Sequence, residues 1–254
     1  MSKRQNIDRI LREWEFDPGE ISVRLIEAGD GREVLQMRVE LGLLQLEVDR
    51  RPDGRRPEGA ETYFDYLLSL AIHEGDDFQL SEEQCIEADR ELVQFYHRRI
   101  CWLVLREYGR AVRDADHSLN FMDFLRRTSP NEEWTQSHEQ YRPFILFHRT
   151  QAAALAELER STPEEAIEEV NRGLDRLREF FDEGDPEYSF EENDMVARLL
   201  ELRQQLREQY QVGQTLAEQL AEAVSKEQYE LAAQIRDQMA KRKPQSGLKR
   251  ARGG

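Results

Sequence analysis

Cysteine and histidine are the residue types in this sequence best suited to metal binding and to nucleophilic chemistry. The two cysteines, Cys85 and Cys101, lie 16 residues apart in stretches that are predicted to be helical. This spacing forms neither a CxxC redox pair nor a thiolate metal site, and we expect two buried free thiols. The histidines show no HExxH or other short metal-ligand spacing: His73, His97, His117, His138 and His148. The sequence therefore predicts no metal site and no cofactor site.

Motifs for phosphoryl, acyl or hydride transfer do not occur in the sequence. It contains no GxxxxGK[ST] phosphate loop, no GxGxxG and no GxSxG. Its carboxylates are spread over predicted helix surfaces, without a partner in a recognisable pocket. We therefore expect no catalytic residues and no enzyme activity. A hydrolase whose acids converge from distant parts of the chain is the alternative in this class.

The chain is strongly acidic, with 36 Lys and Arg against 52 Asp and Glu, a net charge of −16. Nucleic-acid-binding proteins neutralise phosphates with clustered Lys and Arg. We therefore expect no general nucleic-acid binding outside the basic C-terminal stretch. Apolar runs are far shorter than the about 20 residues of a spanning helix, and the first residues, MSKRQNIDRI, lack the apolar core of an export signal. These features predict a cytoplasmic chain that does not enter a membrane.

Alternating apolar residues predict a small sheet near the N-terminus, after a short first helix. The alternation runs over residues 21–25, is interrupted by the turn sequence AGDG, and resumes over 35–41. It then changes phase after Gly42, which indicates a bulge, a bend or a third strand. One antiparallel sheet accounts for the pattern.

The segment RRPDGRRPEG at residues 50–59 repeats an Arg-Arg-Pro-acid-Gly unit, and its prolines and glycines predict a loop. Its arginines allow two interpretations, a basic contact loop or a solvated connector whose arginines pair with nearby acids. We favour the connector, because short runs of charge are usually solvated and no phosphate-loop glycine pattern accompanies this one.

Helical periodicity dominates from Thr62 onward, and one pattern occurs twice. FYHRR at 95–99 is echoed by LFHRT at 146–150. Downstream, two sets of residues share identical spacing: Ala111, Val112, Asp116, Leu119 and Met122, and then Ala166, Ile167, Asn171, Leu174 and Leu177. The two units resemble tetratricopeptide-like helical repeats, which implies a short array with a groove for peptides or protein segments. A plain helical bundle without a ligand groove is the alternative.

Capping signals predict helix starts at four positions: Ser81, Ser129, Thr162 and Ser189. Gly109 falls near a predicted helix end. From about Phe190 the apolar spacing continues to Val224, which predicts one helix roughly 50 Å long at about 1.5 Å per residue. We expect this helix to form a stalk that leads to the C-terminal elements.

The last helical stretch divides into two short helices. Two sets of residues at helical spacing define their faces: Leu216, Leu220 and Val224, and then Tyr229, Ala232, Ala233 and Arg236. Ser225 and Gln228 between them fit a capping box, so we expect the second helix to begin at Lys226. Two helices of this length bury too little apolar surface to be stable alone. The pattern therefore predicts a hairpin that needs a third surface.

This stretch, from Leu216 to Met239, resembles the UVR motif, a helical hairpin found near the end of UvrB, inside UvrC, and in some Clp-protease ATPases and their regulators. The matching positions are Leu216, Leu220, Ala223, Val224, Glu227, Tyr229, Glu230, Ala232, Ala233, Ile235, Arg236 and Asp237. The resemblance covers about 30 of the 254 residues, and Tyr229 stands where the family often has Phe. The helicase motifs of UvrB, the nuclease motifs of UvrC and the cysteine pairs of the Clp-associated regulator are missing.

The resemblance implies that the hairpin is a protein–protein docking element. The residues that it nominates for protein binding are Leu216, Leu220, Val224, Tyr229, Ala232, Ala233, Arg236 and Asp237. We expect Leu220, Val224, Tyr229 and Ala233 to converge on one exposed apolar face. The alternative is an ordinary helical hairpin packed on its own protein.

The sequence as a whole predicts a mainly α fold with a small N-terminal β-sheet, helix-turn-helix repeats, a long helix and a C-terminal helical hairpin. The predicted divisions are an α/β region over 1–60, a repeat domain over 61–188, the long helix with the hairpin over 189–243, and a disordered basic tail over 244–254. We expect the repeat domain to fold as a unit.

The function expected from these features is that of a non-enzymatic adaptor or scaffold, which docks partners through the hairpin and the repeat groove. One alternative is an accessory factor of nucleotide-excision repair that binds UvrB or UvrC. Another is a regulator of a Clp-type protease.

Self-association is expected through residues 189–243. Four apolar residues could extend the hairpin stripe into a coiled-coil seam: Val196, Leu199, Leu206 and Tyr210. Residues 157–194 hold fifteen Asp and Glu against four Arg, a net of −11, and this charge repels a second copy at low salt. We therefore expect a weak dimer that tightens as salt rises, unless another partner takes the same face.

Overall fold

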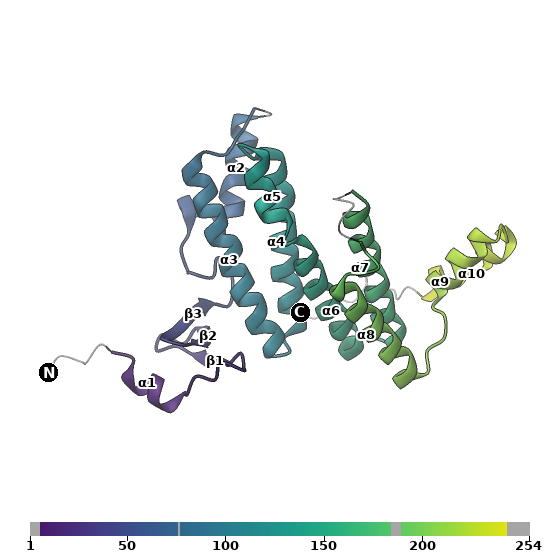
Figure 1. Cartoon of the computed structure of the whole chain (residues 1–254), viewed down its shortest axis with the longest axis horizontal. Coiled ribbons are helices and arrows are strands. Elements are labelled where there is room, and N and C mark those ends of the chain that lie inside the picture. The colour runs from purple at the N-terminus through teal and green to yellow at the C-terminus, as the bar shows by residue number, and fades with distance from the viewer. Residues whose placement is uncertain (1–5, 76, 184–188, 243–254) are drawn as a thin grey trace, which may run out of the picture.

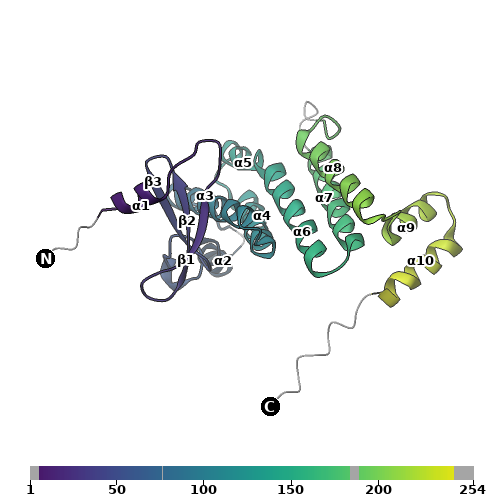
Figure 2. The ribbon, with the colours of Figure 1, turned by 90° about the horizontal axis from the view of Figure 1, so that it is seen from below.

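The computed structural model describes residues 6–75, 77–183 and 189–242, and it is mainly helical with one small sheet (Figure 1). Its elements are α1 (Asp8–Glu13), β1 (Val23–Glu27), β2 (Glu33–Val39), β3 (Gly42–Glu47), a 3-10 turn (Pro57–Gly59), α2 (Tyr63–Glu74), α3 (Glu82–Val104), α4 (Tyr108–Thr128), α5 (Glu132–Glu139), α6 (Arg142–Arg160), α7 (Pro163–Glu183), α8 (Asp194–Tyr210), α9 (Leu216–Ser225) and α10 (Tyr229–Arg242). The sheet lies at one end of the helical array and the α9–α10 hairpin at the other (Figure 2). This arrangement confirms the predicted fold class.

The sheet is antiparallel in the order β1-β2-β3. Val39 pairs with Gly42, so the change of phase at Gly42 marks a tight turn into a third strand. Leu35 and Met37 of the central strand pack against Trp102 of α3, in a core that the sheet shares with the helices. The loop after β3 is also fixed to the helices, because the Arg98 guanidinium donates to the Glu47 carbonyl at 3.1 Å.

The helices form two hairpins, α3–α4 and α6–α7, with α4 packed against α6 and α8 packed against α7. They correspond to the two repeated sequence units. The aligned residues Ala111 and Ala166 are both buried, as are Leu119 and Leu174. Apolar side chains therefore occupy equivalent places in both hairpins, as the repeated spacing predicts.

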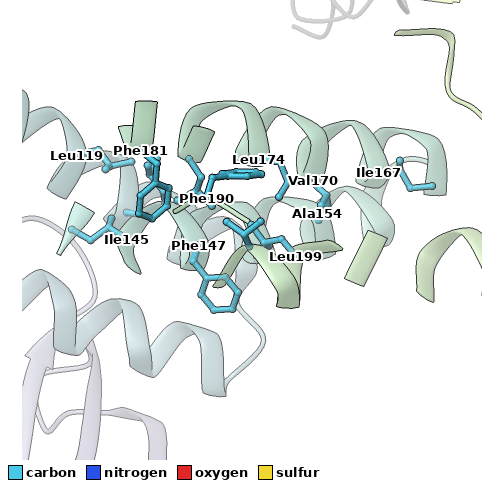
Figure 3. Close-up of a cluster of buried hydrophobic side chains, with 14 of the residues drawn as sticks. Leu119, Ile145, Phe147, Ala154, Ile167, Val170, Leu174, Phe181, Phe190 and Leu199 are labelled. Carbon is cyan, nitrogen blue, oxygen red and sulfur yellow. The ribbon is translucent and has the colours of Figure 1, made fainter. Parts of the chain in front are cut away.

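The largest hydrophobic cluster joins α4, α6, α7 and α8 (Figure 3). Ala154, Val170 and Leu199 are fully buried within it. Beside it, α6 and α7 lie close together at Gly173, where an added Cβ atom would lie 2.6 Å from Thr150 Cβ. Glycine is required here for close packing, because any side chain would overlap Thr150.

Two of the four predicted caps are confirmed and two are wrong. Ser81 forms the expected capping box with Gln84, and Thr162 Oγ1 accepts from Glu165 N at 3.3 Å. Neither Ser129 nor Ser189 begins a helix. The caps are instead the nearby asparagines: Asn131, whose Oδ1 accepts from Trp134 N at 2.8 Å, and Asn193, whose Oδ1 accepts from Met195 N at 2.9 Å. Ser and Asn are about equally good caps, so local sequence alone did not separate them.

Gly109 does not end a helix; it lies in the first turn of α4. The helix α3 ends at Val104, because Arg106 adopts a left-handed conformation with φ 60°. Glu107 N then donates to the Trp102 carbonyl at 2.9 Å, which closes a Schellman-type C-terminus with arginine in the position that usually holds glycine.

The prediction of one helix from Phe190 to Val224 is also wrong. The helix α8 spans 17 residues and ends at Tyr210, where Gln211 adopts a left-handed conformation with φ 54°. Val212 N donates to the Arg207 carbonyl at 3.1 Å, and the chain leaves the helix axis before α9 begins. A separate α8 packs along α7, which a continuous stalk would not do.

Candidate functional site

The hairpin of α9 and α10 is the candidate functional site, and its first helix has a complete cap. Thr215 Oγ1 accepts from Glu218 N at 3.3 Å, and Glu218 Oε2 accepts from Thr215 N at 2.9 Å. Thr215 is buried. This capping box fixes the start of α9 at Leu216.

The turn between the two helices is a Schellman motif, and the capping box predicted for Ser225 and Gln228 is absent from it. Gln228 N donates to the Ala223 carbonyl at 2.8 Å and Glu227 N to the Val224 carbonyl at 3.0 Å. Glu227 has the left-handed φ of 57° that this motif requires. Ser225 is the last residue of α9, and its hydroxyl donates back to the Glu222 carbonyl. The second helix consequently begins at Tyr229.

The interior of the hairpin is a small apolar cluster. Ala223, Ala232 and Ile235 are buried in it, with Leu216, Leu220 and Met239 packed around them. Ala223 and Ala232 permit close approach of α9 and α10 within the hairpin. A core of this size contributes little stability on its own, as the sequence predicts.

The structure divides the predicted protein-binding residues into two groups. Leu216, Leu220 and Ala232 belong to the interior cluster, Ala233 is half-buried, and the others are exposed: Val224, Tyr229, Arg236 and Asp237. We expected one exposed face to hold Leu220, Val224, Tyr229 and Ala233. This expectation is wrong, because Leu220 packs into the interior between α9 and α10.

Three apolar side chains at the turn end of the hairpin remain exposed. Val224 is 51 % exposed, Tyr229 68 % and Leu231 45 %. Leu231 is not among the residues nominated from the sequence, and it lies on a different side of α10 from Tyr229, which precedes it by two residues. We call Val224, Tyr229 and Leu231 the tip patch.

A polar junction fixes the hairpin to the helical array. Glu218 Oε1 accepts from Asn171 Nδ2 of α7 at 3.0 Å and also from the Arg207 guanidinium of α8. Arg203 donates to Asn171 Oδ1 at 2.9 Å. Burial opposes the ionisation of Glu218, but hydrogen bonds from Thr215 and Asn171 and the charge of Arg207 outweigh it and lower the pKa of this carboxyl. The junction therefore holds a charged glutamate between three helices.

The residues predicted to extend a dimer seam do not form one. Val196, Leu199 and Leu206 are buried against the chain's own helices, and Arg203 is engaged at the junction. Tyr210 alone of the predicted seam residues is substantially exposed, at 40 %. The apolar side of α8 packs against the chain's own helices, because α8 is separate from α9 and lies along α7.

A hollow of about 1230 Å³ lies between α4, α5, the start of α6 and α7. Asn120, Gln136 and Asn193 are among the residues that line it, together with Arg126 and Arg176. Its lining mixes charged, polar and apolar side chains.

The two cysteines, which were the first candidates for nucleophilic chemistry, lie outside the hairpin. Cys85 and Cys101 are buried free cysteines, and burial raises the pKa of the Cys101 thiol to about 12. Within the described residues, no three His, Cys, Asp or Glu side chains gather into a group that could hold a metal ion. No helix in the described part of the chain is both long enough and apolar enough to cross a membrane.

Comparison with known proteins places the hairpin in a family. Residues 214–242 match the model of the UvrB/uvrC motif, and this range begins just before the Thr215 cap and ends with α10. No curated protein and no solved structure matches the chain. The C-terminal hairpin, α9 with α10, is thus a UVR motif.

Proposed function

We propose that this chain is a cytoplasmic, non-enzymatic adaptor that docks a partner protein through the tip patch of its UVR motif. The observation that carries the proposal is the exposure of Val224, Tyr229 and Leu231 on a hairpin whose own core is already filled by other residues. Large apolar side chains gathered on a surface favour association, because contact removes them from water.

The partner that fits this surface is a helical segment with its own apolar stripe. Tyr229 supplies a large aromatic ring with a polar hydroxyl, the kind of side chain that dominates binding energy at interfaces. Arg236 and Asp237 are exposed on the same helix and supply a polar rim. The junction at Glu218 holds the hairpin in place before binding, which lowers the entropic cost of docking.

Another UVR motif is the partner class that the family match favours. In UvrB or UvrC it would make this chain an accessory factor of nucleotide-excision repair, and in a Clp-type ATPase a protease regulator. A second copy of this chain presents the same patch and is the third candidate. The hollow between α4 and α7 would give the adaptor a second docking surface.

A charge placed in the tip patch tests the proposal. Tyr229→Asp should weaken binding at least about tenfold, because the new carboxylate must be desolvated in the interface. Tyr141→Asp is the matched control, since Tyr141 is 59 % exposed and lies outside the hairpin. Calorimetric titration of the full chain with UVR hairpins of UvrB, UvrC and a Clp ATPase measures binding to other proteins, and sedimentation measures self-association.

Helix content by circular dichroism should stay unchanged in both variants, because both tyrosines are exposed. A Tyr229→Asp chain that loses helix content would show that the ring is part of the core. A wild-type chain that stays monomeric and binds none of the three hairpins would contradict docking through the UVR motif.

A further inference from the structure

A second cavity, of about 860 Å³, lies where the end of β3 and the Arg-Pro loop of residues 50–59 meet α3 and α4. Its lining contains seven arginines against five Asp and Glu, a local balance of +2. The chain as a whole carries −16. This cavity therefore concentrates positive charge on an otherwise acidic protein, where a small anion is attracted to it.

The inner wall is built from two buried arginines. Arg98 is fully engaged: its guanidinium makes two 2.8 Å bonds to the Asp114 carboxylate and donates to the Arg50 carbonyl at 2.7 Å. Arg51 is 2 % exposed and donates to Glu87 at 2.8 Å, and its Nε lies 3.4 Å from an Asp53 carboxylate oxygen and 3.6 Å from one of Glu91. Both inner arginines are therefore paired with carboxylates, and the donors available to a ligand lie at the mouth of the cavity.

The mouth of the cavity carries arginines with spare donors. Arg50 and Arg56 share one carboxylate, Glu61, at 3.2 and 3.8 Å. Arg55 lies 3.8 Å from Asp53. The side chains of these arginines are 52–70 % exposed. Loose, shared ion pairs of this kind leave most of the five N–H groups of each guanidinium available for a ligand.

The backbone at the cavity is held in an unusual conformation. Arg50 has a left-handed φ of 58°, and Arg98 holds its carbonyl in place. For a residue other than glycine, this region costs about 1–3 kcal/mol and is concentrated at functional sites. The hydrogen bonds from Arg98 to the Glu47 and Arg50 carbonyls hold the loop against α3 in this conformation.

We propose that this cavity binds the phosphate groups of a small phosphorylated molecule, of the class of nucleoside diphosphates. Arginine recognises phosphate through paired, charge-assisted hydrogen bonds, and several arginines at one mouth suit a ligand with more than one phosphate. The volume suits a ligand of nucleotide size. A nucleic-acid strand would instead run over the acidic surface outside the cavity and be repelled.

Calorimetric titration of the full chain with pyrophosphate and with adenosine diphosphate, at low salt, tests the proposal. The double variant Arg55→Gln, Arg56→Gln removes two exposed mouth arginines and should weaken binding at least about tenfold. The matched control is Arg9→Gln, Arg12→Gln, which removes the same charge from the exposed helix α1 and should change affinity less than about twofold.

The assignment would be overturned by a lack of saturable binding of either phosphate compound, by equal weakening in both double variants, or by tighter binding of a single-stranded oligonucleotide than of pyrophosphate. Citrate serves as a carboxylate comparator, and equal affinity for citrate would refute phosphate recognition. Tyr229→Asp leaves the cavity intact, so this test succeeds or fails independently of docking by the UVR motif.

Discussion

The two repeated hairpins share a backbone register but differ in the chemistry at equivalent positions. Arg98 in FYHRR corresponds to Arg149 in LFHRT, and Asp114 and Glu169 each follow an aligned alanine by three residues. Arg98 and Asp114 form a buried pair with two 2.8 Å bonds. Arg149 and Glu169 lie 3.8 Å apart and are partly exposed, and Arg149 also bonds Asp116 at 2.5 Å. An arginine–carboxylate pair thus occurs at equivalent positions in both hairpins, and it is buried only in α3–α4, next to the sheet.

A second pair of equivalent positions differs more. In α3–α4, the buried Arg99 donates to Ser118 at 3.3 Å. In α6–α7, the corresponding residues are Thr150 and Gly173, which touch closely. Burial lowers the pKa of Arg99 to about 10, although Asp114 partly offsets it. The first hairpin therefore has polar contacts at these positions, and the second has close packing. Matching spacing in the sequence predicts which positions are equivalent, but it does not predict which contacts their side chains make.

The largest expected effect comes from the buried ion pair. Arg98→Met should lower the free energy of unfolding by about 4 kcal/mol, because Asp114 remains buried without its counter-charge. Arg149→Met should cost about 1 kcal/mol, because its partners are in contact with water. Urea unfolding of both variants measures the difference. Equal losses would mean that the two pairs are energetically equivalent despite their different burial.

Acid should destabilise the protein to different degrees through the two histidines at equivalent positions, His97 and His148. Burial and then the charge of Arg99 lower the pKa of His148 to about 4, whereas burial lowers the pKa of His97 against a hydrogen bond with the backbone of Val93, which raises it. A lowered folded-state pKa means that stability is lost as pH falls from about 6.5 toward 4, by about 3 kcal/mol for His148.

Urea unfolding at a series of pH values checks this effect. His148→Phe should flatten the dependence between pH 6.5 and 4, and His97→Phe should flatten it less. The prediction fails if His97→Phe is the variant that removes the acid sensitivity.

The smallest expected effect tests the close packing in the second hairpin. Gly173→Ala should destabilise the protein by about 2 kcal/mol through overlap with Thr150. At a helix position without crowding, the same change would stabilise by about 1 kcal/mol, so the sign is diagnostic. Adding Thr150→Ala should restore part of the loss in a double-mutant cycle. Ser118→Ala, at the equivalent place in the first hairpin, should cost about 1 kcal/mol by leaving Arg99 without its hydroxyl partner.

Much of the fold was predictable, because it depends on short-range patterns. The strand alternation, the phase change at Gly42 and the Ser81 capping box are each encoded within a few residues. The helix ends at Val104 and Tyr210 were missed because arginine and glutamine there adopt the left-handed conformation usually reserved for glycine. Neither arginine nor glutamine is a residue type that indicates the end of a helix.

The candidate sites were predictable to different degrees. The UVR motif was identified from the sequence alone, because the residue identities from Tyr229 to Asp237 resemble the family more closely than helical spacing requires. The exposure of its individual residues could not be predicted in this way. It depends on how the two helices pack, which covers Leu220 and leaves Tyr229 in contact with water. For the loop of residues 50–59, local charge favoured a solvated connector, and Arg51 pairs with Glu87 as that interpretation expects. The cavity beside it was not foreseen.

The sequence by itself determined the helical class, the small sheet, the repeated register and the identity of the C-terminal motif, because periodicity and local identities act over a few residues. Only the tertiary structure decided that α8 folds along α7, that Glu218 ties the hairpin to Asn171, and that arginines from the Arg-Pro loop gather beside Arg98. Burial and ion pairing are properties of segments brought together from far apart in the chain, and their free energies exist only after the chain has folded.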